Sequence, residues 1–594
     1  MDFPLSVKGA VWRARLSDGQ TNAALDITEK TGCDPLVARV MAARGATPTT
    51  ARTWLNPKLR DLMSDPSDFA DMNAAIDRIA RAIETNEQIA IFGDYDVDGA
   101  CSTALIARYL SLAGARPALF YIPDRMFEGY GLNAGAISHL AHKQASLLIS
   151  VDCGTTAHAE LAHARQIGLD AIVIDHHEPD PVLPPGLIVN PKRTDDLSGE
   201  QALCAAGVVF LMLVGLNREL RQRGYFASRP EPDLKALAHL VALATIADVA
   251  PLTALNRAFV RAGLHILDNA PGAGLAALLA LAEAKKPLTP TSIGFQIGPR
   301  LNAGGRLGDS SLATLLLLTE NPEEARSIAH QLDTLNAERR ALEQEAVVSA
   351  IKAIETLAHE RGLGPAVFAT GHDWHPGVAG LIAARLAEAY QRPAFAITFQ
   401  GDAGVGSARS GGAADIGLIV KEAAALGIIA RGGGHAAAAG LALTRAQFEP
   451  FCEFVSQRLE EAKDRAAGPP CFLHDGQLAA RTPRDLLTMI GELEAAGPYG
   501  QANPEPTFVI ENASVQHLKI LSGAHIKFAI QTPDLPFHVS AIAFRAADTN
   551  LGRFLTSSAA ERQAIRLLVS AEINEFRGER TPQARIIDAA AAPI

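Results

Sequence analysis

The 594-residue sequence predicts an α/β protein built from several domains. Three short apolar runs in the first half predict strands of a parallel sheet, and a long stretch without glycine or proline predicts a connecting helix. Strand-like segments from about residue 465 onward predict a small C-terminal β-barrel. A composition of 48% hydrophobic and 20% charged residues is typical of folded globular proteins and argues against general disorder.

The predicted parallel strands lie at residues 88–94, 145–152 and 169–175, each followed by a helix-like or loop segment. This spacing is typical of β-α units in a sheet buried on both faces. Each run ends on an aspartate. Because open α/β sheets bind ligands at the carboxyl ends of their strands, we expect these acids to face one crevice.

The predicted long helix begins at Asn321, a capping residue followed by Pro322 and two glutamates. No glycine or proline intervenes before Gly362, and about 40 residues of helix would span about 60 Å. We expect this helix to join two domains, although a core helix of one domain remains an alternative. A glycine-rich second α/β region follows it, and Pro469-Pro470 indicates a linker to the barrel.

These features predict five segments along the chain. They are a helical lead-in (1–80), a parallel-sheet domain (81–310), the connecting helix (311–364), the second α/β domain (365–464) and the β-barrel (465–594).

The six cysteines form no CxxC pair, which fits neither a zinc site nor a disulfide framework and favours a reducing cytosol. The N-terminus lacks a signal-like apolar segment, and the apolar runs elsewhere are too short or too charged to span a bilayer. We therefore expect a soluble, cytoplasmic protein without a membrane partner. The net charge of −11 argues against a general nucleic-acid coat but allows a narrow basic channel.

The densest chemical signal is GDYDVDGACSTAL, where Asp94, Asp96 and Asp98 directly follow a predicted strand. Alternate carboxylates in a loop can converge on a divalent cation, and Gly93 and Gly99 permit a tight backbone. A solvated acidic turn is an equally good interpretation of this fragment alone. An EF-hand is disfavoured because the loop lacks a glutamate at its twelfth position.

Three further segments carry candidate ligands: VDCG with Asp152, IDHHEPD with Asp175, His176 and His177, and ATIADVAPL with Asp248. Imidazole together with carboxylate favours Mn²⁺, Mg²⁺ or Zn²⁺ over Ca²⁺. Asp175 can orient a ligating imidazole without binding metal itself. Five of the side chains suffice for two cations that share a carboxylate, an arrangement suited to displacement at phosphorus: Asp96, Asp98, Asp152, His176 and Asp248.

Positive groups in glycine-rich segments are candidates for binding a substrate phosphate: Arg125, Arg300, Arg306 and Arg409. A guanidinium suits a terminal phosphate, although a surface ion pair explains any one arginine equally well. The second α/β domain adds a candidate phosphate-binding wall made of Ser407, Arg409, Gly433, Gly434 and His435. His375 in WHPGVAG has a similar placement, and a packed structural histidine is an equal alternative.

GDYDVDGACSTAL, VDCG, DHH and ADV, in this order, resemble the motifs of the DHH phosphoesterases. RMFEGYGL (125–132), IGPRLNAGGRLGD (297–309), WHPGVAGLIAARL (374–386) and GGGHAAAAG (432–440) extend the resemblance to the RecJ-like exonucleases over nearly the whole chain. Cys153 stands where asparagine is common and Ala437 where methionine is frequent. Neither departure touches a presumed ligand.

The resemblance implies a DHH catalytic domain, a connecting helix, a DHH-associated domain and an OB-fold. It also implies a 5′-to-3′ exonuclease that degrades single-stranded DNA to 5′-mononucleotides in DNA repair and recombination, with two divalent cations, Mn²⁺ or Mg²⁺. Single-strand binding protein and a RecQ-like helicase are the implied partners, and we expect a monomer. Residue by residue, it carries metal binding to Asp94, Asp96, Asp98, Asp152, His176 and Asp248, and catalysis to Asp96, Asp152 and His177.

Two other functions remain. Oligonucleotide or cyclic dinucleotide phosphodiesterases of the same superfamily use similar metal clusters, but they are usually shorter and lack the C-terminal barrel. A non-catalytic replication scaffold would have lost metal ligands, whereas every ligand position is filled here.

Overall fold

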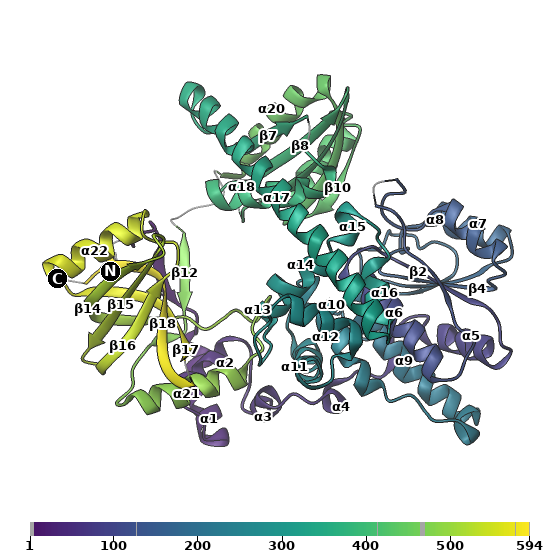
Figure 1. The fold of residues 1–594 in the computed structure, drawn as a ribbon, viewed down its shortest axis with the longest axis horizontal. Helices are drawn as coiled ribbons and strands as arrows, with labels where there is room; N and C mark the ends of the chain where they lie inside the picture. The colour runs from purple at the N-terminus through teal and green to yellow at the C-terminus, as the bar shows by residue number, and fades with distance from the viewer. Residues whose placement is uncertain are drawn as a thin grey trace.

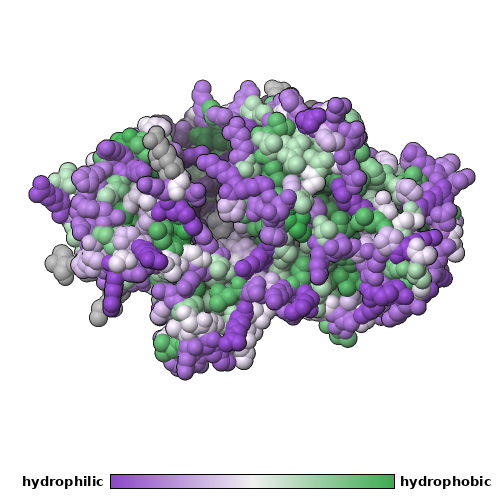
Figure 2. Space-filling model, turned by 60° about the horizontal axis from the view of Figure 1, so that its bottom comes forward, coloured by the Kyte–Doolittle hydropathy of each residue, from purple (hydrophilic) through white to green (hydrophobic). Residues whose placement is uncertain are grey.

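The computed structural model describes residues 5–125, 127–372, 374–412, 414–463, 470–576 and 578–592. The chain forms two α/β domains joined by one long helix, with a β-barrel at the other end of the molecule (Figure 1). Hydrophilic residues cover most of the face shown in Figure 2, and the hydrophobic ones on it gather in separate patches. The predicted fold class is confirmed.

The first domain is built on five parallel strands in the order β3-β2-β4-β5-β6. β2 and β4 are entirely buried, because helices cover both faces of the sheet. Along the strands, alternate residues join two separate cores, one under α5, α6, α9 and α10 and the other under α7 and α8. The three predicted strands are confirmed as β2, β4 and β5; the five strands are β2 (Ile89–Gly93), β3 (Leu119–Tyr121), β4 (Leu147–Val151), β5 (Asp170–Ile174) and β6 (Leu187–Val189).

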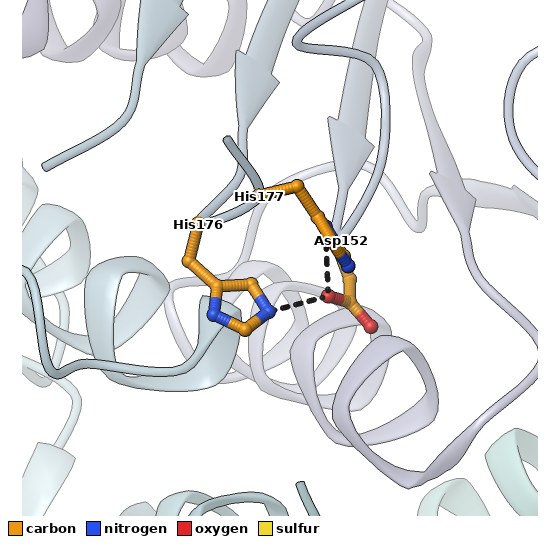
Figure 3. Close-up of side chains that lie close together, drawn as sticks. All are labelled: Asp152, His176 and His177. Atoms are coloured by element: carbon orange, nitrogen blue, oxygen red, sulfur yellow. Dashed lines mark ion pairs between the residues drawn. The ribbon is translucent and has the colours of Figure 1, made fainter. Parts of the chain in front are cut away.

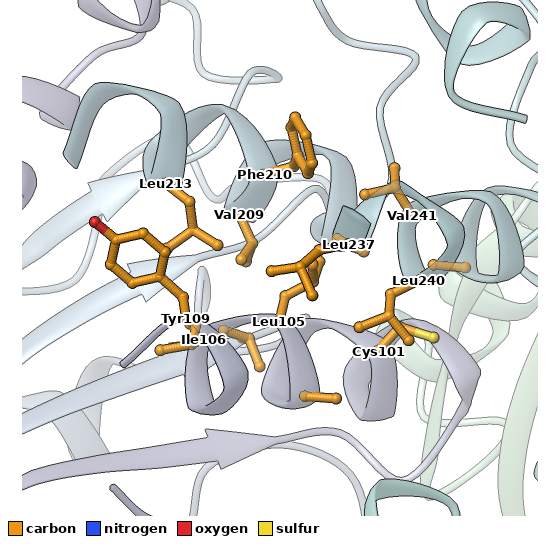
Figure 4. Close-up of a cluster of buried hydrophobic side chains, with 14 of the residues drawn as sticks. Cys101, Leu105, Ile106, Tyr109, Val209, Phe210, Leu213, Leu237, Leu240 and Val241 are labelled. Carbon is orange, nitrogen blue, oxygen red and sulfur yellow. The ribbon is translucent and has the colours of Figure 1, made fainter. Parts of the chain in front are cut away.

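Helix α6 starts at the acidic loop after β2 and packs beneath α9 and α10 (Figure 4). Leu105 and Tyr109 of α6 meet Phe210 and Leu213 of α9 in this buried cluster, and Tyr109 Oη donates to Asn217 Oδ1 at 2.7 Å. The cluster fixes the helix on which the acidic loop is mounted. The helices of this domain are α5 (Met72–Glu84), α6 (Val97–Leu112), α7 (Ala134–His142), α8 (His158–Gln166), α9 (Ala205–Gln222), α10 (Ala238–Ala247), α11 (Ala254–Asn269), α12 (Gly272–Leu281), the short α13 (Pro290–Ser292), α14 (Gly298–Leu301) and α15 (Gly304–Leu307), and α16 (Leu312–Leu318).

Within the described residues, no single helix is both long and apolar enough to cross a membrane. Helices α11 and α12 pass that test when taken together, and they are bent by 80° relative to each other.

The connecting helix α17 covers Pro322–Arg361, as predicted. The Asn321 side chain accepts hydrogen bonds from the backbone N–H groups of Glu323 and Glu324, and Gly362 ends the helix with a φ of 77°. Its N-terminal half belongs to the first domain's core through Ile328 and Leu332, whereas its C-terminal half packs in the second domain. It therefore joins two domains and is not a core helix of one.

The second domain carries a five-stranded sheet in the order β10-β11-β9-β8-β7, in which only β7 and β8 are parallel. Helix α18 packs on one face of the sheet, and α19 and α20 share the core on the other. The elements are β7 (Val367–Gly371), α18 (Ala379–Tyr390), β8 (Ala394–Gln400), β9 (Ala403–Arg409), α19 (Ile416–Ala425), β10 (Arg431–His435), β11 (Ala438–Thr444) and α20 (Arg445–Lys463).

The C-terminal region forms a closed five-stranded barrel, because β14 pairs with β15 on one side and with β17 on the other. Closure leaves these strands no free edge. Its elements are β12 (Cys471–His474), β13 (Gly476–Gln477), α21 (Pro483–Ala496), β14 (Phe508–Leu521), β15 (His525–Thr532), β16 (Leu535–Ala543), α22 (Asn550–Glu561), β17 (Ile565–Phe576) and β18 (Glu579–Ala591).

Residues 5–55 pack with this barrel, an arrangement that no local sequence pattern indicated. β1 (Val11–Ala14) pairs in parallel with β12, and helices α1 (Asp18–Thr31), α2 (Pro35–Ala43) and α3 (Ala51–Leu55) contribute to the barrel's core. Residues 72–84, by contrast, pack in the first domain as α5. Pro469 of the expected linker lies outside the described residues.

Candidate metal centre and phosphate-binding site

The acidic loop between β2 and α6 is held by a helix cap and a close glycine contact. Asp96 Oδ1 accepts hydrogen bonds from the N–H groups of Asp98 (2.8 Å) and Gly99 (3.1 Å) at the start of α6. A Cβ on Gly99 would lie 2.4 Å from the carbonyl oxygen of Asp94, so only glycine fits. The predicted tight backbone is present and keeps the three aspartates of the loop together.

Asp98 is 1% exposed and faces the N-terminus of α9. Its two carboxylate oxygens accept hydrogen bonds from the N–H groups of Ala205 (2.7 Å) and Ala206 (2.8 Å). A helix N-terminus favours a negative charge, yet burial and the nearby charge of Asp248 raise the pKa of Asp98 well above its usual range. The protein's own groups therefore supply too little positive charge to stabilise the ionised form of the Asp98 carboxylate.

Asp152 and His176 meet where β4 and β5 end (Figure 3). Asp152 has a φ of 62°, in the left-handed region that few residues other than glycine adopt. His176 Nε2 lies 3.2 Å from Asp152 Oδ1, 3.7 Å from Asp98 Oδ2 and 3.9 Å from Asp248 Oδ2. Residues from four separate segments thus converge on one point, and among them Asp152 lies at a strand end, as the strand-end argument predicted.

The ligand atoms form three overlapping groups, in each of which they lie within 4.8 Å of one another. The groups are Asp94–Asp96–Asp152, Asp98–His176–Asp248 and Asp152–His176–His177. Within the described residues, Asp94 Oδ1 and Asp152 Oδ1 are buried without a hydrogen-bond partner. A buried carboxylate oxygen without a partner is costly, and divalent cations would compensate these two. The donor set therefore fits the predicted metals.

The protonation states point the same way. Burial, followed by nearby carboxylate charges, raises the pKa of Asp94 and of Asp152 well above the usual range and raises that of Asp248 to about 7. Burial and the charge of His177 lower the pKa of His176 to about 3, so this imidazole is neutral at physiological pH. Neutral imidazole is the form that binds metals.

Asp175 orients the two histidines, and both of its oxygens are occupied by protein donors. It accepts hydrogen bonds from the backbone N–H groups of Thr155, His176 and His177, and its Oδ1 lies 2.8 Å from His177 Nδ1. Burial opposes the charged forms of both partners, but their interaction lowers the pKa of Asp175 and raises that of His177 to about 9. The imidazole that the Asp175 carboxylate holds in place is therefore that of His177.

A group of arginines lies beside the acidic loop. Burial, followed by the charges of Arg125, Arg339 and Arg409, lowers the pKa of Arg306 to about 10. Arg125 stacks over the ring of Tyr95, with its Cζ 5.1 Å from the ring centroid. In the part of the chain that the structure describes, no carboxylate lies within ion-pair distance of Arg125, Arg306 or Arg409. The surplus positive charge suits an anionic ligand.

Arg306 also links the two α/β domains, because its Nη1 donates to the carbonyl oxygen of Gly377 at 3.1 Å. His375 caps the turn at Gly377, and burial together with the charge of Arg125 lowers its pKa. Arg300 is not brought into this group. Its Nε donates to Asp333 Oδ1 at 2.8 Å, so it is held against the connecting helix in an ion pair.

The expected wall of the second domain lies on adjacent strands of its sheet. Ser407 and Gly433 are both register partners of Gly440, one on each side, so the three form a row across β9, β11 and β10. Arg409 lies at the end of β9, two residues beyond Ser407 on the same side of that strand. His435 ends β10, and Gly434 has a φ of 154° just before it.

Sequence reasoning missed several residues of the site. Tyr130 Oη contacts both Asp152 and His177, and Asn190 Nδ2 donates to Thr155 Oγ1 and to the carbonyl oxygen of His177. Asn190 directly follows β6, so the strand-end rule would have found it if that strand had been recognised. Tyr130 lies in RMFEGYGL, from which only the arginine was selected.

Three family models match the chain: the DHH family N-terminal domain at residues 88–245, the DHHA1 domain at 363–461 and the RecJ OB domain at 477–588. The single-stranded-DNA-specific exonuclease RecJ of Dickeya dadantii is 34% identical over 560 residues, covering 92% of this chain and 94% of the relative. A crystal structure of RecJ in complex with Mn²⁺ from Thermus thermophilus superposes with a TM-score of 0.80 and 28% identity, covering 98% of this chain and 80% of that one. A structure of the Thermus protein with Mg²⁺ has a TM-score of 0.74 and 26% identity, covering 98% and 79%.

The sequence identity to RecJ extends over almost the full length of the chain. The three matched domains and the cluster of candidate metal ligands lead to the same family. The chain belongs to the RecJ family of single-stranded-DNA-specific exonucleases, within the DHH superfamily.

Proposed function

We propose that this chain is a metal-dependent exonuclease that hydrolyses single-stranded DNA from the 5′ end and releases 5′-mononucleotides, in DNA repair and recombination. The observation that carries the proposal is that, among the described residues, buried carboxylates of the site lack positive partners while neighbouring arginines lack negative ones. Asp94 and Asp152 present buried carboxylate oxygens without hydrogen-bond partners in the described part of the chain. Arg125, Arg306 and Arg409 form no ion pair within the described residues, and the charge of Asp96 acts on Arg306 only from beyond ion-pair distance. Divalent cations would supply the positive partners and a DNA phosphate the negative one.

Two cations, Mn²⁺ or Mg²⁺, would be held by the candidate ligands Asp94, Asp96, Asp98, Asp152, His176 and Asp248. When bound, such cations lower the pKa of a water molecule and stabilise the charge that develops on the phosphoryl oxygens. Asp96 and Asp152 have catalytic roles because they hold the reacting centre. His177 keeps Nδ1–H on Asp175, so its Nε2 is available to exchange a proton with the departing 3′-oxygen.

The arginines account for the direction of cleavage. Arg125, Arg306 and Arg409, with Ser407, His375 and the glycine-rich turn at Gly433, Gly434 and His435, would hold the 5′-terminal phosphate. Water attacks the next phosphorus, and the bond to the 3′-oxygen of the first nucleotide breaks. The remaining strand then carries a new 5′-phosphate, so each cycle regenerates the group that the arginines recognise.

The segments have separate tasks in this proposal. Residues 81–310 carry the chemistry, 311–364 set the spacing, 365–464 hold the terminal phosphate, and the barrel at 465–594 holds the rest of the strand. Single-stranded DNA is the substrate, and a single-strand binding protein and a RecQ-like helicase are the proposed partners of a monomeric, cytoplasmic enzyme.

An end-label comparison tests the function. Strands labelled at the 5′ or the 3′ end, blunt duplex, RNA and cyclic dinucleotides would each be incubated with Mn²⁺ or Mg²⁺, with an Asp152→Asn preparation as the control for contaminating nucleases. We expect 5′-labelled single strands to release labelled mononucleotides from the earliest times, while 3′-labelled strands shorten gradually and blunt duplex reacts slowly. Faster hydrolysis of cyclic dinucleotides than of DNA, or immediate release of the 3′ label, contradicts the proposal.

A further inference from the structure

One hydroxyl group joins a metal-ligand candidate to the proposed proton carrier. Tyr130 lies in the loop between β3 and α7, flanked by Gly129 (φ 85°) and Gly131 (φ 86°), whose left-handed backbones only glycine adopts readily. This Gly-Tyr-Gly turn places Tyr130 Oη 3.2 Å from the carbonyl oxygen of Asp152 and 3.2 Å from His177 Nδ1. The tyrosine ring lies edge-on to the His177 ring, with 5.7 Å between their centroids.

The donors and acceptors at these atoms can be assigned. The Asp175 carboxylate accepts only, so His177 Nδ1, 2.8 Å from Asp175 Oδ1, carries the hydrogen. Tyr130 Oη therefore faces a donor at Nδ1 and an acceptor at the Asp152 carbonyl, and its own hydrogen goes to that carbonyl. The result is a continuous network from Asp175 through His177 and Tyr130 to the backbone of Asp152.

Both ends of this network need support. Asp152 keeps a left-handed backbone that its side chain does not favour, and such conformations persist only where the surroundings fix them. The side chain of His177 is 48% exposed, so packing alone does not immobilise its ring. The Tyr130 hydroxyl acts on both residues at once.

We propose that Tyr130 is a positioning residue, whose hydroxyl fixes the Asp152 backbone and the His177 ring relative to each other. The inference rests on the proposed hydrolysis and adds a residue outside the acidic motifs to it. Without the hydroxyl, His177 Nε2 points at the leaving oxygen for a smaller fraction of the time, and Asp152 Oδ1 is less well placed for a cation. The DNA-binding surface is unchanged.

Tyr130→Phe removes the hydroxyl and keeps the ring. We expect kcat on 5′-phosphorylated single strands to fall about tenfold, the effect of losing one hydrogen bond worth about 1.4 kcal/mol, while KM stays within about twofold. Mn²⁺ binding, followed without DNA from the free-ion electron paramagnetic resonance signal, should weaken severalfold. Tyr109→Phe is the matched control, because its hydroxyl bonds the buried Asn217 far from the ligands; it should lower the melting temperature and leave kcat unchanged.

The outcomes separate the possibilities. Wild-type kcat and Mn²⁺ binding in Tyr130→Phe would overturn the inference. An unchanged kcat with a raised KM in Tyr130→Phe or Tyr130→Ala would make the ring a substrate contact and overturn it as well. If the wild-type enzyme cleaved no DNA, the proposed function itself would fail, and the Mn²⁺ titration would still decide whether Tyr130 positions Asp152.

Discussion

Asp152 Oδ1 lies 3.2 Å from His176 Nε2, where the carboxyl ends of β4 and β5 come together. The same oxygen is buried, lacks a hydrogen-bond partner within the described residues and belongs to a carboxylate shared by two of the three ligand groups. Among the described side chains of the site, no other has these properties together. Asp152 is therefore the point at which the proposed metal centre is most vulnerable.

Replacing Asp152 should abolish turnover. Asp152→Asn is preferable to Asp152→Ala, because asparagine tolerates the left-handed backbone at this position better. We expect a loss of about 100-fold or more, the usual effect of removing a key electrostatic group. Single-turnover rates at saturating Mn²⁺ measure it, and circular dichroism controls for folding. A folded variant that keeps more than about a tenth of wild-type turnover contradicts the assignment.

The metal-free protein should lose stability as the pH rises toward neutrality. Burial and the charge of Asp96 raise the pKa of Asp248 to about 7 in the folded state, against about 4 in an unfolded chain. A raised carboxyl pKa contributes stability that is complete below the unfolded value and is lost as the pH passes the folded one. The free energy of unfolding should thus fall between about pH 4 and 7.

Urea denaturation of the metal-free protein at pH 5 and pH 8 measures this change, with Asp248→Asn as the control that should respond less to pH. Mn²⁺ at pH 8 should restore stability, by about 2.7 kcal/mol per site at a hundredfold excess over Kd. If the free energy of unfolding changed equally with pH in wild type and Asp248→Asn, groups other than Asp248 would determine the pH dependence of stability.

The sequence predicted the elements that local patterns encode. The connecting helix has its cap at Asn321 and no glycine or proline before Gly362, so its ends could be predicted almost to the residue. The strands β2, β4 and β5 are continuous apolar runs, and their acidic ends identified the site. These signals lie within a few residues of the feature that they specify.

Features that depend on distant partners were not predictable in this way. The pairing of β1 with β12 joins Val11 to Cys471, two segments far apart in the chain, and no local pattern marks it. Asp98 was predicted as a ligand, but its contacts with Ala205 and Ala206 come from a helix 107 and 108 residues away. Arg300 and Arg409 both lie in glycine-rich segments, so the sequence could not distinguish them. The fold shows that Arg300 is held in an ion pair with Asp333 and does not join the arginine group.

Arg409→Ala should weaken recognition of the 5′-terminal phosphate. A lost charge-assisted contact is worth about 1.5–3 kcal/mol, so KM for 5′-phosphorylated strands should rise about tenfold or more. The preference over 5′-hydroxyl strands should shrink, because the variant no longer distinguishes the two ends well. Steady-state kinetics on both substrates would show this.

Arg458→Ala is the control for Arg409→Ala. Arg458 lies on α20, on the other side of the same sheet, and pairs with Glu422 and Glu461. Its removal should leave KM unchanged. Equal effects of the two substitutions, or an unchanged end preference in Arg409→Ala, would remove Arg409 from the phosphate site.

The final prediction concerns where the chain can be cut. Removing only residues after 468 would expose buried residues of the N-terminal segment, such as Ile27 and Met41, which share the barrel's core. We expect this fragment to aggregate, because it presents a large apolar surface to water. A fragment of residues 58–468 avoids that exposure, although Arg257 loses its contacts with Trp54 and with the carbonyl oxygens of Ala496 and Gly497.

The 58–468 fragment should keep metal-dependent cleavage, because all the candidate ligands and the arginine group lie within it. It should need more DNA to reach half-maximal rate, and long strands should suffer more than short ones because they lose the contacts that an OB-like barrel makes along a strand. Binding should also depend less steeply on salt, since fewer counterions are released. Fluorescence anisotropy with strands of two lengths, at several salt concentrations, measures both effects. If the folded fragment binds long strands as tightly as the full chain, with the same salt dependence, the barrel has a task other than holding DNA.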